Sequence, residues 1–188
     1  MDIKDKIDID VFKVVINAVT ESDDLETMTA QLTQLLVGAL EIKGCTIFVL
    51  NPETEALESL ASFGLSMKYL NKGPVLLKKS IDTKLRKEPI IISDIEKSDR
   101  LQYPQNAKQE GIKGIVSLPI NYYGRMIGVL RLYHHDVWDI SERDIDSLQI
   151  LAGNIGMAIT YTRILNALQS VMDSVNDIHT VWLYPKKG

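Results

Sequence analysis

Residues 111–133 have the sequence GIKGIVSLPINYYGRMIGVLRLY, and this stretch decides the fold of the chain. β-Branched and other apolar residues dominate 111–120 and again 126–133, and such runs are typical of strands. The residues between them are Asn-Tyr-Tyr-Gly, a turn sequence in which Gly124 can adopt a positive φ angle that other residues tolerate poorly. The stretch therefore predicts a β-hairpin.

A helix is predicted to follow this hairpin. Ser141 is the natural N-cap, because its hydroxyl can accept a hydrogen bond from the backbone near Asp144. Asp144 favours the positive end of the helix dipole, and Ile140 and Ile145 have the spacing of a hydrophobic staple. Since these signals agree with one another, they specify the start of the helix well.

The same helix is expected to be long. From Glu142 to about Ile178, apolar residues recur close to a heptad seam, which Gln169 and Asn176 interrupt. One interpretation is a continuous helix whose part beyond Ile159 packs against a partner chain or the N-terminal helix. The other is a helix that ends near Thr160, followed by a short helix folded back on the domain. We favour the first, because an apolar seam of this kind usually packs against a partner helix.

The N-terminal half predicts two helices and a second hairpin. Apolar residues at helical spacing predict the first helix within 3–19. The second helix is predicted to begin after Asp23, with Glu26 in the capping-box position. Residues 45–63 alternate in the manner of two strands, with turn chemistry at 51–54, and so predict a hairpin.

Three segments carry a family resemblance: DIEKSDRLQYP at 94–104, EGIKGIVSLPI at 110–120 and GRMIGVL at 124–130. Together they resemble the second half of a GAF domain, and the resemblance extends from about Asp10 to Ile159. It implies an α+β fold related to PAS domains, with a central antiparallel sheet of about five or six strands, helices on both faces and long terminal helices.

This resemblance also implies a domain organisation. Residues 1–20 would form an N-terminal helix used for packing or dimerisation, 21–160 the GAF domain, and 161–188 a C-terminal helical extension and tail. GAF domains are sensor and dimerisation modules of signalling proteins, and the family includes binders of cyclic nucleotides, haem, bilins and amino acids.

Composition restricts the class of protein. The 188 residues are 45% hydrophobic, enough for one domain with a substantial core. The net charge of -4 and the pI near 5.4 argue against a nucleic-acid surface. No apolar run approaches the roughly 20 residues that cross a bilayer, and the N-terminus lacks the apolar core of a signal peptide. We therefore expect a cytoplasmic protein that binds neither nucleic acid nor membrane.

Catalytic signals are sparse. The sequence has no glycine-rich phosphate loop, no nucleophile elbow and no histidine pair at zinc-ligand spacing on a helix. Cys45 is the single cysteine, and one group of GAF proteins reduces free methionine sulfoxide with several cysteines. The alternative for Cys45 is a small buried hydrophobe at the start of a strand, which is far more common. We expect no enzyme and no metal site.

Cofactor signals are equally weak, so the cofactor stays unknown. Bilin-binding relatives attach their chromophore through a cysteine, and residues 65–113 contain none. The Asn-Lys-Phe-Asp-Glu signature of cyclic-nucleotide relatives is absent. His134 and His135 follow the main hairpin and could ligate haem iron or another metal, but adjacent histidines at a strand end more often face solvent.

The resemblance implies a small-molecule pocket on the sheet face away from the terminal helices. The matching positions in this chain are the region 63–103, from which Phe63, Asp94 and Tyr103 are the named candidates, and the strand residues Ile115, Ser117, Val129 and Arg131. Strand alternation places Val129, Arg131 and Tyr133 on one face, and the leucines between them on the other. The alternative is a degenerate domain in which Leu70 and residues 75–77 fill the pocket with side chains.

Arg131 is the one charged residue in an otherwise apolar strand. It could pair with a ligand carboxylate or phosphate, because guanidinium recognises planar anions through paired hydrogen bonds. A structural ion pair with Asp94, or a side chain that snorkels to solvent, is the competing interpretation. Basic residues crowd the segment 65–90, and their positive field would favour an anionic ligand or an acidic partner.

The sequence thus predicts a non-catalytic regulatory or sensor protein of signal transduction that forms a homodimer through its terminal helices. It would bind a partner or a small molecule such as an anion, and a separate signalling protein would respond to its state. Two alternatives remain open: a redox enzyme of the free methionine sulfoxide reductase type that uses Cys45, and a structural dimerisation module without a ligand.

Overall fold

The hairpin predicted from residues 111–133 forms the two longest strands, β5 (Gly114–Tyr122) and β6 (Arg125–His134), in a computed structural model that describes residues 7, 9–21, 24–77 and 88–183. Its turn has positive φ angles at both Tyr123 (47°) and Gly124 (72°). Two consecutive residues with positive φ give a tight turn whose twist matches the flanking strands. The prediction from the glycine is confirmed.

A six-stranded antiparallel sheet surrounds this hairpin, in the order β3-β2-β1-β6-β5-β4. The predicted second hairpin is also present, and its first strand pairs with β6. The remaining strands are β1 (Gly44–Leu50), β2 (Ala56–Phe63), β3 (Val75–Leu76) and β4 (Ile90–Ile92).

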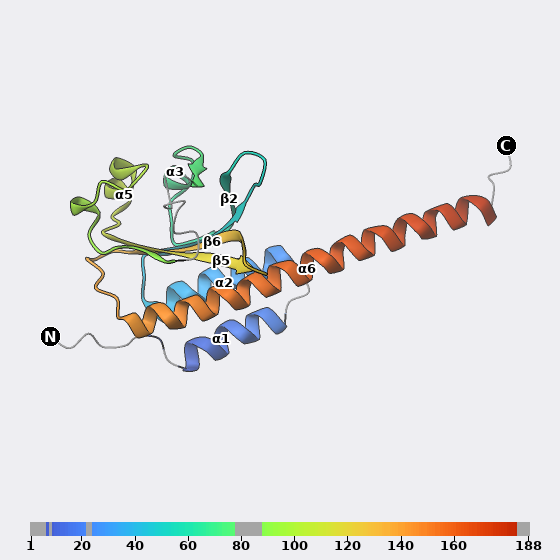
Figure 1. Cartoon of the computed structure of the whole chain (residues 1–188), viewed down its shortest axis with the longest axis horizontal. Helices are drawn as coiled ribbons and strands as arrows, with labels where there is room; N and C mark the ends of the chain where they lie inside the picture. Colours follow the sequence, from blue (N-terminus) through green and yellow to red (C-terminus); the bar gives the residue numbers. More distant parts are fainter. Residues whose placement is uncertain (1–6, 8, 22–23, 78–87, 184–188) are drawn as a thin grey trace.

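Helices cover both faces of the sheet, as predicted (Figure 1). One face carries the three long helices, of which α2 packs on β1 and β2 and α6 packs on β5 and β6. The other face carries short elements. The bounds are α1 (Ile9–Thr20), α2 (Leu25–Leu40) and α6 (Glu142–Leu183) for the first face, and α3 (Met67–Leu70), η2 (Ile95–Lys97) and α5 (Pro104–Glu110) for the second.

Each face has its own hydrophobic core, and β6 contributes to both. Leu130 and Leu132 are buried in the core beneath the long helices, whereas Val129 and Tyr133 are buried in the second core, beneath the short elements. This division is the alternation predicted for the strand. It places Arg131 on the second face, between two buried apolar residues.

The helix N-caps agree with the sequence in one case and differ in the other. Ser141 Oγ accepts a hydrogen bond from the backbone N–H of Asp144 at 3.0 Å, as predicted. The start predicted after Asp23 for α2 is wrong, because the cap is Asp24, whose carboxylate accepts from the backbone N–H of Thr27 at 2.7 Å. Glu26 therefore lies one position too early to complete a capping box.

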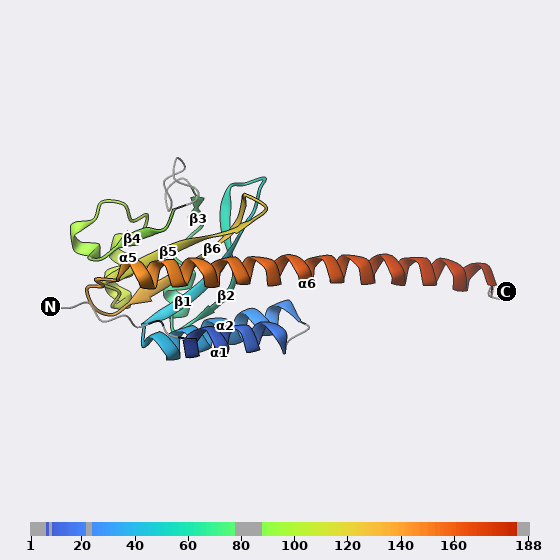
Figure 2. The same ribbon diagram turned by 60° about the horizontal axis from the view of Figure 1, so that its bottom comes forward.

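α6 is one continuous helix of 42 residues, so the predicted alternative of a break near Thr160 is wrong. Its length is about 63 Å at 1.5 Å per residue, and roughly its C-terminal half extends past the rest of the molecule (Figure 2). Among the described residues, no helix combines the length and the apolar character that crossing a membrane requires.

Candidate functional site

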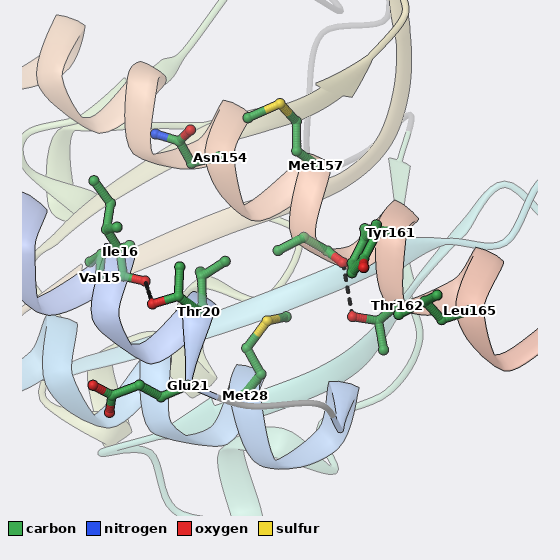
Figure 3. Close-up of a pocket in the computed structure, with 12 residues that line it drawn as sticks. Val15, Ile16, Thr20, Glu21, Met28, Asn154, Met157, Tyr161, Thr162 and Leu165 are labelled. Atoms are coloured by element: carbon green, nitrogen blue, oxygen red, sulfur yellow. Dashed lines mark hydrogen bonds between the residues drawn. The ribbon is translucent and has the colours of Figure 1, made fainter.

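Two hollows of different character lie on opposite faces of the sheet. The larger, an open groove of about 830 Å³, runs between α1, α2 and α6 and is lined mainly by apolar side chains (Figure 3). The smaller, a cavity of about 30 Å³, lies over β5 and β6 beneath the short elements. Among the described residues, Lys72, Arg100 and Arg131 line the smaller hollow, whereas Glu21 is the one charged residue of the groove, so we place the candidate site in the smaller hollow. Its lining residues are Tyr69, Lys72, Val75, Ile92, Arg100, Leu101, Gln102, Tyr103, Ile115, Ser117 and Arg131.

Arg131 occupies the floor of this cavity and is 9% exposed. Its Nε–H donates a hydrogen bond of 3.0 Å to Ser117 Oγ, on the neighbouring strand β5, where the two residues are register partners. The guanidinium also lies over the ring of Phe48, with Cζ 5.4 Å from the ring centroid. Within the described ranges no carboxylate forms an ion pair with Arg131. The cation is thus buried next to polar and aromatic groups, without a countercharge.

Lys72 brings a second cation to the same cavity. Its ammonium group lies 3.8 Å from the centroid of the Tyr69 ring and donates a 3.0 Å hydrogen bond to the Tyr69 carbonyl oxygen. The pKa of Lys72 is lowered to about 8, mainly by burial and also by the positive charge of Arg131, while the carboxylate of Glu110 acts in the opposite direction. Arg100 lines the cavity as well, so three cations surround one partly enclosed space, an arrangement that a bound anion would relieve.

Tyr69, which lines the cavity, and Tyr133, which is buried in the second core, are held as neutral groups. Burial raises the pKa of both Tyr69 and Tyr133. For Tyr133, the Arg131 guanidinium and the Thr46 hydroxyl act in the opposite direction. The rings of Tyr69 and Tyr133 pack edge to face, with centroids 5.8 Å apart. The wall of the cavity is thus preorganised by ring packing.

A polar clamp closes the outer side of the cavity. Tyr103 Oη donates to the Pro74 carbonyl oxygen at 2.9 Å, and Gln102 Nε2 donates to the same oxygen, also at 2.9 Å. Gln102 Oε1 accepts from the backbone N–H of Leu76 at 3.1 Å. The residues before α5 are therefore tied to the segment that forms β3, so the Tyr103 hydroxyl serves this clamp.

The structure gathers four of the seven residues predicted for the pocket, namely Tyr103, Ile115, Ser117 and Arg131. Val129 is fully buried in the second core and does not line the cavity. Phe63 is 42% exposed at the end of β2, away from the cavity.

Asp94 also lies outside the cavity. Its carboxylate accepts from the backbone N–H of Glu96 at 3.0 Å and forms an ion pair of 3.2 Å with Lys97. These contacts hold the pKa of Asp94 below its ordinary value, the Glu96 N–H making the largest contribution. The predicted alternative of an ion pair between Arg131 and Asp94 is wrong, because this carboxylate caps η2 and pairs with a neighbouring lysine.

The sequence placed the region 63–103 at the pocket but did not single out six residues of it that line the cavity: Tyr69, Lys72, Ile92, Arg100, Leu101 and Gln102. Lys72 was visible only as one of seven basic residues in 65–90, of which the structure describes Lys68 and Lys72. No local pattern distinguishes it from the others, because its role depends on the tertiary approach of α3 to β6. The short helix predicted near 82–87 lies outside the described residues.

The predicted filling of the pocket is present in part. Val75 and Leu77 are buried in the second core, and Val75 also lines the cavity. The remaining volume of about 30 Å³ accommodates a small polyatomic ion or a few waters. Ligands of cofactor size generally occupy several hundred Å³, so haem or a nucleotide does not fit this conformation.

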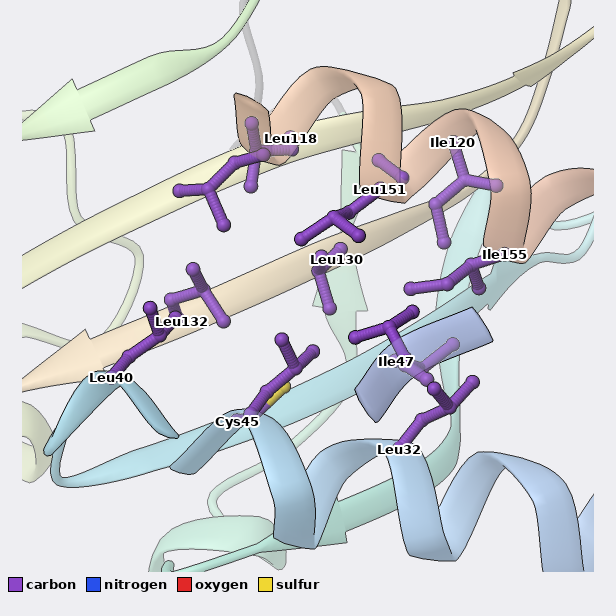
Figure 4. Close-up of a cluster of buried hydrophobic side chains, with 14 of the residues drawn as sticks. Leu32, Leu40, Cys45, Ile47, Leu118, Ile120, Leu130, Leu132, Leu151 and Ile155 are labelled. Atoms are coloured by element: carbon purple, nitrogen blue, oxygen red, sulfur yellow. The ribbon is translucent and has the colours of Figure 1, made fainter. Parts of the chain in front are cut away.

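Cys45 lies in the other core, beneath the long helices, and is fully buried among leucine and isoleucine side chains (Figure 4). Burial raises the pKa of its thiol far above the ordinary value. The reactive form of cysteine is the thiolate, so this environment makes the side chain inert. The interpretation of Cys45 as a buried hydrophobe is the one that the geometry supports.

We expect the Cys45 thiol to react with an aromatic disulfide reagent at least ~100-fold more slowly in the folded protein than in denaturant, because reaction requires opening of the core. The absorbance of the released aromatic thiol measures the rate. A Ser59→Cys variant, with its new thiol at an exposed position of β2, is the control and reacts at once. Rapid labelling of native Cys45 would contradict this assignment.

The histidine pair differs from its predicted environment, because His134 is buried and only His135 is exposed. His134 Nδ1 accepts the backbone N–H of Asp136 at 2.9 Å, and the two imidazole rings stack with centroids 4.6 Å apart. The ligand atoms of these three residues lie within 4.8 Å of one another. However, Asp136 forms an ion pair of 3.3 Å with Lys113, the residue before β5. The three residues therefore form a turn that is held against the start of β5.

A family model described as "GAF domain" matches residues 22–160. A search of curated proteins finds no match. Among solved structures, the GAF domain of a phosphoenolpyruvate-protein phosphotransferase from Coxiella burnetii has 19% identity and a TM-score of 0.74, with 85% of this chain and 96% of that chain covered. The corresponding domain from Acinetobacter has 17% identity and a TM-score of 0.71, with the same coverage.

An enzyme is also among the similar structures. Free methionine-R-sulfoxide reductase from Neisseria meningitidis, solved with its substrate, has 13% identity and a TM-score of 0.68, with 87% of this chain and 98% of that chain covered. At these identities the likeness extends to the fold alone.

Proposed function

The chain belongs to the GAF domain family, and we propose that within this family it is a non-catalytic regulatory sensor, cytoplasmic and homodimeric, that binds a small oxyanion in the cavity around Arg131. The ligand class is an inorganic oxyanion or the carboxylate of a small metabolite. A separate signalling protein would respond to the bound state.

The observation that carries this proposal is the buried Arg131 guanidinium without a countercharge among the described residues. A buried cation costs free energy unless an anion or several acceptors compensate it. Ser117 Oγ already accepts the Nε–H, so its own O–H is free to donate toward a ligand. Lys72 adds a second charge from the turn that follows α3. Oxyanions match such a set, because each oxygen accepts charge-assisted hydrogen bonds.

A non-catalytic role is supported by what the cavity contains. Among the residues that the structure describes, its lining includes cations, tyrosines and a serine, but no carboxylate or histidine to act as a general base. The sole cysteine lies on the opposite face of the sheet, inside the core. Loss of a reductase activity in Cys45→Ser would instead support the enzyme interpretation.

The strand β6 supplies a physical route from the cavity to the long helices. Arg131 faces the cavity, while Leu130 and Leu132 pack in the core that also contains Leu151 and Ile155 of α6. A ligand shifts the arrangement of α6 only if it binds one arrangement better than the other. An anion that orders the Arg131 side chain would also hold β6 in one position against α6. It would therefore bind that arrangement better than the other.

Thermal unfolding tests the proposal. We expect phosphate, sulfate or acetate to raise Tm in a dose-dependent manner over chloride at equal ionic strength, since a ligand that binds only the folded state stabilises it by about 2.7 kcal/mol at a hundredfold excess over Kd. Arg131→Gln should abolish the shift. Arg125→Gln removes an exposed arginine of the same strand and should leave the shift intact. Equal shifts in both variants would refute binding at this cavity.

Anion binding is also expected to depend on pH through Lys72. The groups that face it are Arg131, Glu110 and the rings of Tyr69 and Tyr103. Below pH 8 the ammonium is charged and attracts an anion, whereas deprotonation removes that charge, so the affinity should fall as pH rises through about 8. Titration of sulfate, whose charge is constant in this range, measures the effect. In Lys72→Met the affinity should be lower and independent of pH from 7 to 9.

A further inference from the structure

Among the residues that the structure describes, Lys72 is the one primary amine that lines the cavity around Arg131. It is half-buried, on the face of the sheet that carries α3 and α5 (Figure 1). Its Nζ lies 3.8 Å from the centroid of the Tyr69 ring and 6.0 Å from that of the Tyr103 ring. We propose that Lys72 is a carbamylation site, at which the amine combines with carbon dioxide and the cations of the cavity hold the resulting carbamate. This inference rests on the oxyanion site of the proposed function and names a ligand for it.

The first argument is the charge of the cavity. Lys72, Arg100 and Arg131 line it, whereas no carboxylate does so within the described part of the chain. The Arg131 guanidinium is buried against the Ser117 hydroxyl and the Phe48 ring, which carry no charge. A carbamate on Lys72 replaces one of the three cations with an anion. It thus supplies, from within the chain, the countercharge that a buried guanidinium needs.

The second argument is the size of the cavity, about 30 Å³. A carbamate adds only one carbon and two oxygen atoms to an amine that is already in place. Cofactor-sized donors of an acyl group generally need a pocket of several hundred Å³. Carbon dioxide needs no such carrier, and because it is uncharged, the cations of the lining do not attract water-shielded counterions with it. An imine or an amide on Lys72 would be neutral, so neither would compensate Arg131.

The third argument is the reactivity of the amine, because carbon dioxide combines with a neutral amine and not with an ammonium group. The pKa of Lys72 is lowered from 10.5 to about 8, mainly by burial and also by the charge of Arg131. This change raises the neutral fraction at pH 7 on the order of 100-fold over that of an ordinary lysine. The charged and titratable groups around the amine are Arg131, Arg100, Glu110, Tyr69 and Tyr103.

The reaction balances with carbon dioxide as its only co-reactant. The lone pair of the neutral Lys72 Nζ forms a bond to the carbon, one carbon–oxygen π bond breaks, and its electron pair remains on that oxygen. The nitrogen then releases one proton to water and keeps one N–H, which can retain the 3.0 Å hydrogen bond to the Tyr69 carbonyl oxygen. Ser117 accepts one of the five N–H donors of Arg131, so donors remain for the planar carboxylate of the product.

Chemical trapping tests the proposal on the full chain. The protein is equilibrated with isotope-labelled carbon dioxide at neutral pH and treated with triethyloxonium ion, which converts a carbamate into a stable ethyl ester. Peptide mass spectrometry then locates the label, which we expect on Lys72. Lys68, an exposed residue of α3, is the internal control and should carry far less label. Lys72→Arg keeps the cation and should lose the label, and Arg131→Gln should reduce it.

Two results of this experiment would overturn the carbamate. Equal labelling of Lys68 and Lys72 would show that the cavity gives Lys72 no advantage. A wild-type protein without label on Lys72 would show that no carbamate forms there, because bicarbonate that binds without a covalent bond leaves no ester on the amine. Circular dichroism of each variant confirms that its domain is folded.

Thermal unfolding separates the carbamate from the oxyanion site. In buffer freed of carbon dioxide, sulfate should raise the Tm of the wild type, and carbon dioxide added at the same pH should diminish this shift, because the carbamate occupies the cavity. In Lys72→Arg carbon dioxide should leave the sulfate shift unchanged. An equal loss in both proteins would indicate competition by bicarbonate and overturn the carbamate. A sulfate shift without any label on Lys72 overturns the carbamate alone, whereas the absence of both overturns the oxyanion site as well.

Discussion

Replacing Leu36 with alanine should lower the free energy of unfolding by about 2–5 kcal/mol. Leu36 lies on α2 with its side chain fully buried in the core beneath the long helices. Truncation removes apolar contacts with its neighbours and leaves a cavity that close packing cannot refill. Urea denaturation at one fixed protein concentration, followed by circular dichroism, measures the change.

The adjacent residue provides a matched control. Leu35 lies on the same helix but is 38% exposed, so Leu35→Ala makes the same chemical change with similar helix propensity. We expect a loss of about 0.5–1 kcal/mol. Equal losses at Leu35 and Leu36 would show that α2 does not present the face described above.

Gly128→Ala is expected to destabilise the domain by about 3 kcal/mol, at the upper end for an added methyl group. Gly128 lies on β6 opposite Val49 of β1. A Cβ atom at Gly128 would lie 2.2 Å from the Phe48 carbonyl oxygen, a backbone atom that rotation of a side chain cannot move. The two strands would have to separate locally, with loss of ladder hydrogen bonds. The midpoint of urea unfolding measures the effect.

Gly38→Ala is the control for this substitution. Gly38 lies within α2. Apart from its chain neighbours and the backbone of its own helix, no described atom lies within 4 Å of the position that a Cβ would take. Alanine there should stabilise the domain by about 0.5–1 kcal/mol, because it reduces the conformational freedom of the unfolded chain. The same chemical change is thus predicted to have opposite signs at two glycines. Comparable destabilisation at both sites would contradict the assigned contact at Gly128.

The sequence predicted the two hairpins, the cap at Ser141 and the continuity of α6 because each depends on local chemistry. Alternation along β6 also placed Arg131 and Leu130 on opposite faces before the structure was known. The predicted start of α2 is wrong by one residue, because Asp23 and Asp24 are equally good N-cap residues by sequence and only the geometry selects Asp24. Boundaries of this kind are poorly specified by neighbouring residues.

The cavity was predicted less completely than the fold, for a physical reason. Ser117 and Arg131 lie on paired strands, so the periodicity of the strands locates them. Lys72 reaches the cavity from the turn after α3, and Gln102 from the segment before α5. Their positions depend on loop paths that no periodic pattern encodes. Strand alternation placed Val129 on the correct face. Whether it lines the cavity or is buried beneath it depends on the packing of the second core.

The unsupported part of α6 has a further consequence. Isolated helices of this length are of marginal stability in water, because nucleation is costly and packing normally supplies most of the stability. The residues beyond Thr162 have exposed apolar side chains up to Asn176, so their order depends on what covers them. If copies of the chain cover one another, the order of this part of α6 depends on the local concentration of the protein. A downstream protein that recognises the ordered helix would then respond to abundance as well as to a ligand.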